Sequence, residues 1–389
     1  MNIIFFSTIL LSKNCNGGEI GSQFFIDALR QNGHQVMVVG YLRKGDLLEH
    51  DPQQTVIVAE RYTETKKSKL YLLLWMLLSF IINIPYSSAK FISWNYVKQA
   101  RRLLSQQVYD VAIIDHAQMG WLLNYIEKPK TLILNAHNVE HQIYAENQNR
   151  SRNFLAKLIY HRESRTLKRL ENHVAENVDQ IWTITQHDAT YFSKLNLFGK
   201  IHQFDHIGIP PRFKPLPQET SKTYDIGLIA SWSWRANEEA LQWFLKEIYP
   251  VLPLEVTIHV AGKGADWLTN RYANIHYLGI VADAQTFMAQ ARVVAIPTLS
   301  GGGIQIKTLD AIASGSRIVA TSIALRGITD PPATIQVADN PKIFAAQLLA
   351  ALSGTASIEA YQAAARWIKA RQTKFIAEIA NALVNLEPQ

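Results

Sequence analysis

Short apolar runs alternate with amphipathic segments along most of the chain. Residues 3–8 form a largely apolar run of the kind that is buried on both faces of a parallel sheet. Phe24, Phe25 and Ala28 then recur at helical spacing, and Gly33 ends that helix. Further short strands are expected at residues 36–39, 111–114, 131–134 and 180–184. This alternation of strands and helices predicts an α/β fold with a doubly wound parallel sheet.

A second series of strands and helices follows a proline-rich stretch. Prolines cluster between residues 210 and 217, so regular structure should stop there and we place a domain boundary after residue 207. Strands are expected at residues 226–229, 256–260, 275–278, 293–296 and 318–320. The prediction is therefore an N-terminal Rossmann-like domain, residues 1–207, joined by the C-terminal helix 358–389, and a second Rossmann-like domain, residues 208–357.

Composition adds little to this picture. The chain has 389 residues, of which 48% are hydrophobic and 18% charged, as expected for a folded protein of two domains. Its net charge of +7 favours anionic partners, although the excess of cations is spread along the chain. No nucleic-acid motif is found. The one cysteine, Cys15, excludes an intramolecular disulfide and indicates a cytoplasmic location.

Residues 70–89 form an uncharged segment with a leucine-rich centre, and lysines flank it at positions 66, 67, 69 and 90. Asn83 and Pro85 interrupt its end, so a membrane-spanning helix is disfavoured. Two interpretations remain open. The segment is either a helix buried in the first domain or, over residues 66–90, a surface that contacts anionic lipid at the inner face of a membrane.

The clearest candidate chemistry follows the predicted strand 293–296. Three glycines at 301–303 let the backbone approach a ligand, and the helix that begins next points free N–H groups at it. Lys307 lies in the first turn of that helix, where a cation is unfavourable unless an anion binds nearby. Asp310, on the same face, can accept hydrogen bonds from ribose hydroxyls, and Arg326 would border the same site. The plainer alternative is a flexible loop before an ordinary surface helix.

Residues 300–315 and 317–321 resemble the donor-site signature of retaining glycosyltransferases of family 4, which have the GT-B fold. Further matching segments occur in the expected order at residues 17–18, 33–36, 135–140, 233–237, 261–264 and 278–281. The resemblance implies two Rossmann-like domains facing a central cleft. It also implies hexosyl-type transfer, with retained configuration, from a nucleoside-diphosphate sugar to a hydroxyl acceptor. The uncharged segment 70–89 and its lysines suggest a lipid-linked or saccharide acceptor, in polysaccharide or glycolipid assembly.

The resemblance also implies roles for individual residues. His137 would lie beside the anomeric carbon and Lys307 would neutralise the departing diphosphate, so these two are the catalytic candidates. Apart from the resemblance, the positions of His116 and Glu140 after predicted strands make them acceptor-side candidates. A structural role is plainer for His116, and capping the next helix is plainer for Glu140. No cofactor and no bound metal are expected, because cationic side chains and helix ends stabilise the leaving group. The donor-binding candidates are Gly17, Gly18, Arg235, Lys263, Gly301, Gly302, Gly303, Lys307 and Asp310.

The sequence departs from the family pattern at three positions. Gly302 stands where a glutamate is often found, and Ser231 and Asn237 stand where an arginine and a lysine are usual; Arg235 and Lys263 are nearby substitutes. These departures keep open a catalytically degenerate GT-B scaffold or binding subunit. A nucleotide-sugar epimerase is a further alternative, but the missing glutamate argues against it. A dinucleotide dehydrogenase is disfavoured because the first loop lacks G-x-G-x-x-G.

Overall fold

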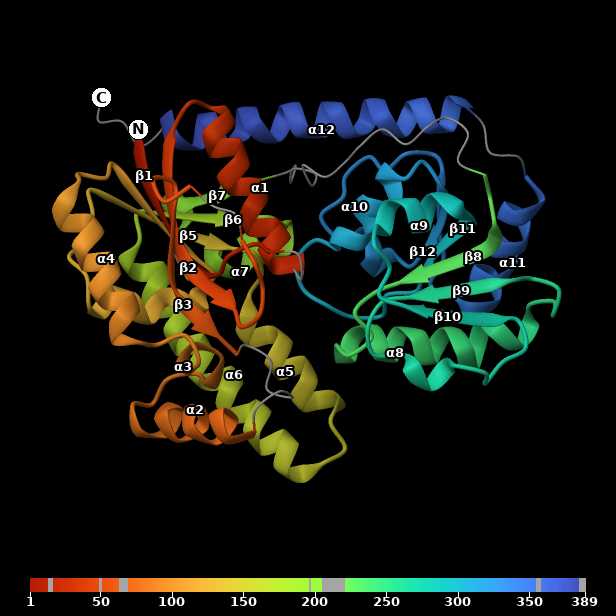
Figure 1. Cartoon of the computed structure of the whole chain (residues 1–389), viewed down its shortest axis with the longest axis horizontal. Helices are drawn as coiled ribbons and strands as arrows, with labels where there is room; N and C mark the ends of the chain where they lie inside the picture. Colours follow the sequence, from red (N-terminus) through yellow and green to blue (C-terminus); the bar gives the residue numbers. More distant parts are fainter. Residues whose placement is uncertain are drawn as a thin grey trace. The chain divides into compact units, whose positions relative to one another are not determined.

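The computed structural model describes residues 1–12, 17–48, 51–62, 69–195, 197–204, 221–354 and 358–384. The chain divides into two compact units, one made of Met1–Gly208 with Phe375–Gln389 and the other of Ile209–Lys374 (Figure 1). Each unit is a parallel sheet with helices on both faces, so the predicted α/β fold is confirmed. Cys15, Lys66, Lys67 and the prolines at positions 210–217 lie outside the described residues.

The sheet of the first unit has seven parallel strands in the order β3-β2-β1-β4-β5-β6-β7. Strand order reverses direction between β1 and β4, and open α/β sheets bind ligands beyond the carboxyl ends of the strands at such a point. The strands are β1 (Asn2–Ile9), β2 (Gln35–Arg43), β3 (Thr55–Arg61), β4 (Val111–Asp115), β5 (Thr131–Ala136), β6 (Gln180–Thr183) and β7 (Ile201–Gln203). The edge strands β3 and β7 are additions to the prediction.

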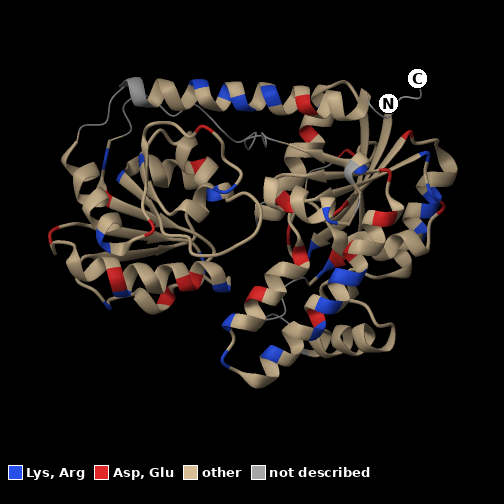
Figure 2. Ribbon diagram, turned by 180° about the vertical axis from the view of Figure 1, so that it is seen from behind, with Lys and Arg blue, Asp and Glu red and all other residues tan. Residues whose placement is uncertain are grey.

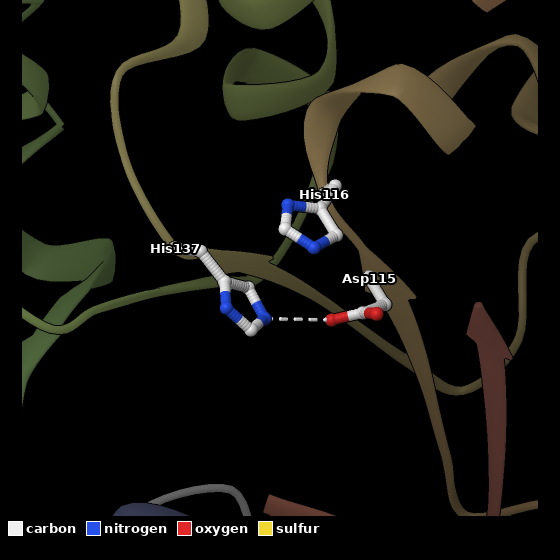
Figure 3. A group of neighbouring side chains, drawn as sticks. All are labelled: Asp115, His116 and His137. Carbon is white, nitrogen blue, oxygen red and sulfur yellow. Dashed lines mark hydrogen bonds and ion pairs between the residues drawn. The ribbon is translucent and has the colours of Figure 1, made fainter. Parts of the chain in front are cut away.

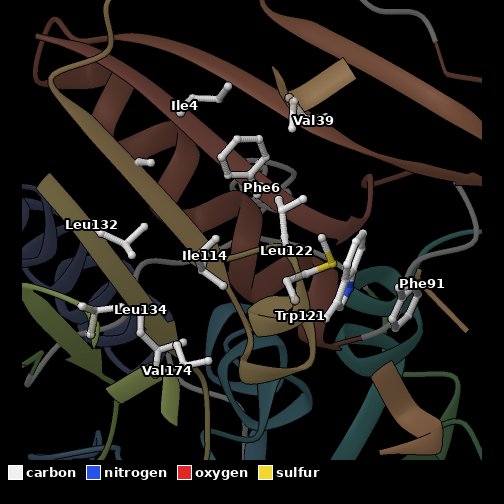
Figure 4. Close-up of a cluster of buried hydrophobic side chains, with 14 of the residues drawn as sticks. Ile4, Phe6, Val39, Phe91, Ile114, Trp121, Leu122, Leu132, Leu134 and Val174 are labelled. Atoms are coloured by element: carbon white, nitrogen blue, oxygen red, sulfur yellow. The ribbon is translucent and has the colours of Figure 1, made fainter. Parts of the chain in front are cut away.

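Helices cover both faces of this sheet. Ile4 and Phe6 of β1 point to one face, where they join a core that includes Trp121 and Val174 (Figure 4). Phe25 lies on the other face. The helical segments are α1 (Gly17–Gln31), α2 (Lys69–Ile81), α3 (Tyr86–Ala89), α4 (Trp94–Gln106), η2 (Ala117–Asn124), α5 (Glu140–Arg150), α6 (Phe154–Asn177), α7 (Gln186–Ser193) and η3 (Phe198–Lys200).

The second unit repeats this plan with six parallel strands in the order β10-β9-β8-β11-β12-β13. The strand order of this sheet reverses direction between β8 and β11, so the loops after these two strands flank the topological switch point. The strands are β8 (Tyr224–Ile229), β9 (Ile258–Ala261), β10 (Ile275–Gly279), β11 (Ala291–Ile296), β12 (Arg317–Ala320) and β13 (Ile335–Val337). The helices are α8 (Arg235–Trp243), continued by a π-helical turn (Phe244–Ile248), α9 (Ala284–Gln290), α10 (Ile306–Ala313) and α11 (Pro341–Ser353).

The last helix, α12 (Ile358–Val384), contributes to both units. In the second unit the indole Nε1 of Trp367 donates a hydrogen bond to the carbonyl of Asp330. In the first unit Phe375 is fully buried and its ring centroid lies 5.2 Å from that of Phe25. The helix from residue 358 was expected to join the first domain as a whole, but only its part from Phe375 belongs to that unit.

Helix α2, which occupies the start of the uncharged segment, is not buried. Leu70, Leu73 and Leu77 are 68%, 64% and 57% exposed, so the interpretation as a helix buried in the first domain is wrong. Among the described residues, no helix is both long enough and apolar enough to cross a membrane.

Candidate active site

A buried carboxylate at the end of β4 organises the switch point of the first unit. Asp115 Oδ2 accepts hydrogen bonds from the hydroxyls of Ser7 at 3.0 Å and Ser22 at 2.6 Å. Asp115 Oδ1 accepts from Asn135 Nδ2 at 3.0 Å and from His137 Nε2 at 2.9 Å. The four donors lie on β1, on α1, on β5 and at the residue directly after β5. The carboxylate therefore connects four segments of the chain, namely β4, β1, α1 and β5.

Asp115 remains ionised in this setting. Burial would raise its pKa, but the neighbouring His116 and His137 and the hydrogen bonds lower the pKa to about 2. An ionised Asp115 requires a proton on His137 Nε2, which leaves Nδ1 of that ring as its hydrogen-bond acceptor. Burial and the nearby His116 lower the pKa of His137 despite Asp115, so the ring is neutral at neutral pH.

His116 stacks on His137 with ring centroids 4.1 Å apart (Figure 3). Burial works to lower the pKa of His116, but Asp115 and Glu140 outweigh burial and raise it. The two stacked rings therefore differ: His116 is the one that takes a positive charge. Glu140 Oε1 lies 3.5 Å from His116 Nδ1. Both oxygens of this buried carboxylate lack a hydrogen-bond donor among the described residues, so they can receive a group of a ligand.

The position of Glu140 depends on a second buried carboxylate. Glu171 of α6 accepts hydrogen bonds from the backbone N–H of Glu140 at 2.6 Å and of His141 at 3.1 Å. It also contacts His141 Nδ1 at 2.6 Å. Glu171 thus caps the N-terminus of α5, a role for which the sequence suggested Glu140. The Glu140 side chain is released from capping and lies beside His116 instead.

Helix α1 approaches His137 so closely that one position on it tolerates no side chain. A Cβ atom added at Gly21 would lie 2.9 Å from both Cε1 and Nδ1 of His137. Gly17 and Gly18 form the first turn of the same helix, and the carbonyl of Gly18 accepts a hydrogen bond from the Ser22 hydroxyl at 3.1 Å.

Asp115, His116 and His137 also have the spacing that a metal ion requires, with their candidate ligand atoms within 4.8 Å of one another. However, Asp115 accepts four hydrogen bonds, and one of its donors is His137. A metal ion would have to displace these donors. The arrangement is that of a self-contained hydrogen-bond network.

In the second unit, the loop between β11 and α10 has the backbone geometry of a ligand loop. Gly301 and Gly303 have φ angles of 135° and 64°, which other residues rarely adopt. Arg326 Nη1 donates a hydrogen bond to the carbonyl of Gly301 at 2.6 Å, so its cation lies at this loop. Helix α10 begins at Ile306, and its N-cap residue, Gln305, offers no side-chain cap. Its first N–H groups are therefore available to an anion.

Lys307 is the cation at this helix start. Its Nζ donates a hydrogen bond to Asn237 Oδ1 at 2.9 Å, and Asn237 in turn donates to the carbonyl of Ser231 at 3.0 Å. Within the described residues no carboxylate pairs with Lys307, and burial lowers its pKa to about 8. A desolvated ammonium beside the positive end of a helix favours a bound anion. Asp310 is buried one turn later.

The loop after β9 packs directly on the loop after β8. A Cβ at Gly262 would lie 1.9 Å from the carbonyl oxygen of Ala230, and one at Gly264 would lie 2.7 Å from the backbone nitrogen of Ser233. Trp232 is buried and its indole donates to a backbone carbonyl, so it packs rather than faces a ligand. The β8 loop also lies beside Lys307, because Asn237 bonds both Ser231 of this loop and the Lys307 ammonium.

The family model for glycosyl transferases of group 1 matches residues 223–354. These residues contain the glycine loop, Lys307, Asn237 and Arg326, so the match falls on the site described above. No curated protein matches the sequence.

Solved structures match the whole chain. WaaG, a glycosyltransferase involved in lipopolysaccharide biosynthesis, is 14% identical over 94% of this chain and 95% of its own, with a TM-score of 0.62. Anabaena HepE, solved in complex with UDP-glucose, is 12% identical over 99% and 100% of the two chains, with a TM-score of 0.61. A mutant of S. aureus TarM, solved with fondaparinux, alpha-GlcNAc-glycerol and UDP, is 12% identical over 99% of each chain, with a TM-score of 0.61. The protein has the GT-B fold.

The structure brings the residues predicted for the first unit together. His116, His137 and Glu140 form one cluster around Asp115. Three residues that contact this cluster were not predicted from the sequence: Ser7, Ser22 and Gly21. Gly21 and Ser22 lie near the start of α1, where glycines and a serine follow one another, and this composition was a signal that could have identified them.

The predicted donor residues of the second unit separate into two groups. Lys307 and Asp310 lie on α10 behind the glycine loop. Arg235 forms an ion pair with Glu239 on the same helix, with Nε 2.8 Å from the carboxylate, and Lys263 lies exposed in the loop after β9. The amide of Asn237, noted in the sequence only as a missing cation, is the group that holds Lys307.

Proposed function

We propose that the protein transfers a hexosyl unit from a nucleoside-diphosphate sugar to a hydroxyl acceptor with retained anomeric configuration, as a family 4 glycosyltransferase. The observation that carries the proposal is Lys307: an ammonium at a helix N-terminus, desolvated, hydrogen-bonded to an amide and without a carboxylate partner in the described residues. A diphosphate supplies the negative charge that this environment lacks.

In this reaction the bond between the anomeric carbon and the diphosphate oxygen breaks, and both electrons leave with the diphosphate. The acceptor oxygen forms the new bond, and its proton passes to the departing diphosphate. The glycine loop would lie against the diphosphate, with Gly301, Gly302 and Gly303 allowing close approach. Lys307 and the first N–H groups of α10 would stabilise the departing charge, and Asp310 would hold the ribose. These groups supply the stabilisation that a metal ion gives elsewhere, so we propose that no metal is required.

The cluster in the first unit would serve the sugar and the acceptor. His137 is neutral, with an acceptor nitrogen, and would contact a sugar hydroxyl beside the anomeric carbon. Glu140 and His116 would bind the acceptor, since the Glu140 carboxylate has oxygens to which no described donor is bonded. A saccharide or lipid-linked acceptor provides hydroxyls for these groups. We propose a cytoplasmic enzyme of polysaccharide or glycolipid assembly, peripheral at the inner face of the membrane; the role of WaaG in lipopolysaccharide biosynthesis supports this pathway class.

The proposal is tested by a thermal-shift screen over UDP-, GDP- and ADP-sugars, followed by turnover measurements with the sugar that stabilises the protein. We expect Lys307→Ala to weaken UDP binding and to lower kcat/KM by about a hundred- to thousand-fold, the loss typical for one group that stabilises a leaving charge. Lys246→Gln is the matched control, because Lys246 is exposed and pairs with Glu247.

Two outcomes would contradict the proposal. If no nucleotide sugar binds or is hydrolysed, the donor site is not functional and the protein is a scaffold. If nucleotide sugars bind but the Lys307→Ala protein turns over at the wild-type rate, the anion site is placed wrongly. Nuclear magnetic resonance of the product's anomeric proton decides between retention and inversion.

A further inference from the structure

Helix α2 exposes an apolar face. Leu70, Leu73, Leu74, Leu77 and Ile81 follow one another at helical spacing, and each is at least half exposed. The side facing the protein carries Ser79, which is buried. This is the reverse of an ordinary surface helix, whose apolar stripe faces the core. Such a face is costly in water unless something covers it.

The start of α6 continues this apolar surface. Phe154, Leu155, Leu158 and Ile159 are exposed in its first two turns. Together the two helices and Ile82, the residue after α2, hold twelve of the twenty-three exposed large apolar side chains found in the described residues. We call these twelve the α2–α6 surface; they are Leu70, Tyr71, Leu73, Leu74, Leu77, Phe80, Ile81, Ile82, Phe154, Leu155, Leu158 and Ile159.

Arg162 connects the two helices. From α6 its guanidinium donates hydrogen bonds to the hydroxyl of Ser79 at 2.8 Å and to its carbonyl at 2.7 Å. The same guanidinium lies 4.0 Å from the centre of the Phe80 ring. In addition, Glu163 accepts hydrogen bonds from the backbone N–H of Tyr86, just after α2. These contacts hold α6 against the C-terminal end of α2 and the start of α3.

The charges around the α2–α6 surface are almost all positive (Figure 2). From Arg150 to Arg169 the chain has seven cations: Arg150, Arg152, Lys157, Arg162, Arg165, Lys168 and Arg169. The acidic residue in that stretch, Glu163, is buried beneath α3. Arg152 and Lys157 are exposed beside the apolar residues of α6. The exposed rim of the surface is therefore cationic.

We propose that the α2–α6 surface docks the protein onto an anionic lipid bilayer. The apolar face would enter the boundary of the acyl chains, and the cations on α6 would remain among the headgroup phosphates. Helix α2 has 13 residues, so it is about 20 Å long and would lie in the interface rather than cross it. Tyr71 and Trp75, with ring centroids 5.7 Å apart, add an aromatic pair of the kind that favours this depth. A protein partner would need acidic residues to match the rim; anionic headgroups provide that charge directly.

The test is sedimentation of the full-length protein with vesicles of phosphatidylcholine, alone or with about 30% phosphatidylglycerol. We expect binding to the anionic vesicles and weaker binding at high salt. The double variant Leu73→Glu with Leu77→Glu should lower partitioning at least about ten-fold at every salt concentration, because two leucines no longer enter the bilayer. Its control is Val251→Glu with Leu254→Glu, two exposed apolar residues of the second unit.

The cations are tested separately. Lys157→Gln should lower partitioning to the anionic vesicles by about five-fold, which corresponds to about 1 kcal/mol per basic residue, and leave binding to pure phosphatidylcholine unchanged. Lys246→Gln should leave binding to both kinds of vesicle unchanged. All substituted side chains are exposed, and unchanged thermal unfolding checks that the variants fold.

The proposal is overturned if the wild-type protein binds neither vesicle, or if the Leu73 and Leu77 substitutions leave binding intact. It is also overturned if wild type forms concentration-dependent oligomers that Leu77→Glu dissolves, since a second copy then covers the surface. None of these measurements uses sugar transfer, so this inference and the proposed transferase activity fail separately.

Discussion

Two stacked histidines show that local context sets residue chemistry in this protein. His137 is buried and His116 is partly buried, and their pKa values shift in opposite directions. His116 faces the negative charges of Asp115 and Glu140, while His137 is mostly affected by burial and by His116 itself. The sequence identified both histidines as candidates. It did not indicate which one is neutral, because that depends on the distance from each ring to carboxylates elsewhere in the chain.

Asn237 illustrates the same point in the second unit. In the sequence it looked like the loss of a family cation. In the structure its amide holds the Lys307 ammonium and connects it to the β8 loop. A second lysine at this position would lie beside Lys307 and repel it. The departure is therefore compatible with a working anion site.

Binding of UDP should depend on pH through Lys307. Burial lowers the pKa of Lys307 to about 8 in the free protein, and a bound diphosphate raises it by favouring the ammonium form. Binding above pH 8 then takes up a proton, so affinity should fall as pH rises, by up to about ten-fold per unit. Calorimetric titration between about pH 7.5 and 9.5 measures this.

Lys307→Arg is the control for this titration, since arginine keeps its charge over the whole range. The slope of affinity with pH should disappear in that variant. An equal slope in wild type and Lys307→Arg would mean that another group titrates, and the assignment of the diphosphate to Lys307 would then be wrong.

At the scale of elements, the central strands were predictable, whereas three of the four edge strands were not. The predicted run at residues 3–8 corresponds to β1 and the run at 111–114 to β4, both buried along almost their whole length. The missed strands β3, β7 and β13 lie at sheet edges and are largely half-buried or exposed. A strand covered on both faces leaves a continuous apolar run, whereas an edge strand mixes polar residues and loses that signal.

The fit of α1 against His137 gives an element-scale prediction. Alanine normally favours a helix interior over glycine by about 1 kcal/mol. At Gly21, however, the new Cβ would lie 2.9 Å from the His137 ring, which Asp115 holds in place. We expect Gly21→Ala to lower the free energy of unfolding by about 1–2 kcal/mol and to reduce the transfer rate further, by displacing His137. Denaturant unfolding and steady-state kinetics measure the two effects.

Gly199→Ala is the matched control, because a Cβ at Gly199 meets no atom within 4 Å and its backbone needs no positive φ. That variant should keep both stability and activity. A stable and fully active Gly21→Ala protein would show that His137 does not depend on α1.

At the scale of the whole molecule, α12 serves two units with different parts of its length. Its early part contacts the second unit, where Arg371 Nη2 donates to the carbonyl of Gly327 at 3.1 Å. Its last part completes the core of the first unit, where Phe375 packs against Phe25 and Phe204. The sequence indicated that the helix returns to the first domain because no strand follows it. The amphipathic pattern of the helix does not show that its first part packs on one unit and its last part on the other.

Phe375→Ala should therefore destabilise the first unit selectively. The side chain is fully buried, and removing a buried phenylalanine costs about 3–5 kcal/mol. Hydrogen exchange resolved by peptide should rise in α1 and β6 and stay unchanged in β8 and β11. Phe344→Ala, in the core of the second unit, should give the opposite distribution. Equal increases in both units for each variant would mean that the two unfold as one.

The sequence by itself determined the features that depend on local order: two series of parallel strands, a glycine loop after one of them, and a lysine in the first turn of the next helix. Tertiary structure decided what those features contact. Asp115 meets Ser7 and Ser22 across 108 and 93 residues, and the leucines of α2 face outward although their apolar run suggested burial as readily. Periodicity reports only which side of a helix or strand is apolar. Strand order and packing of distant segments decide which carboxylate reaches a histidine and which apolar face is left uncovered.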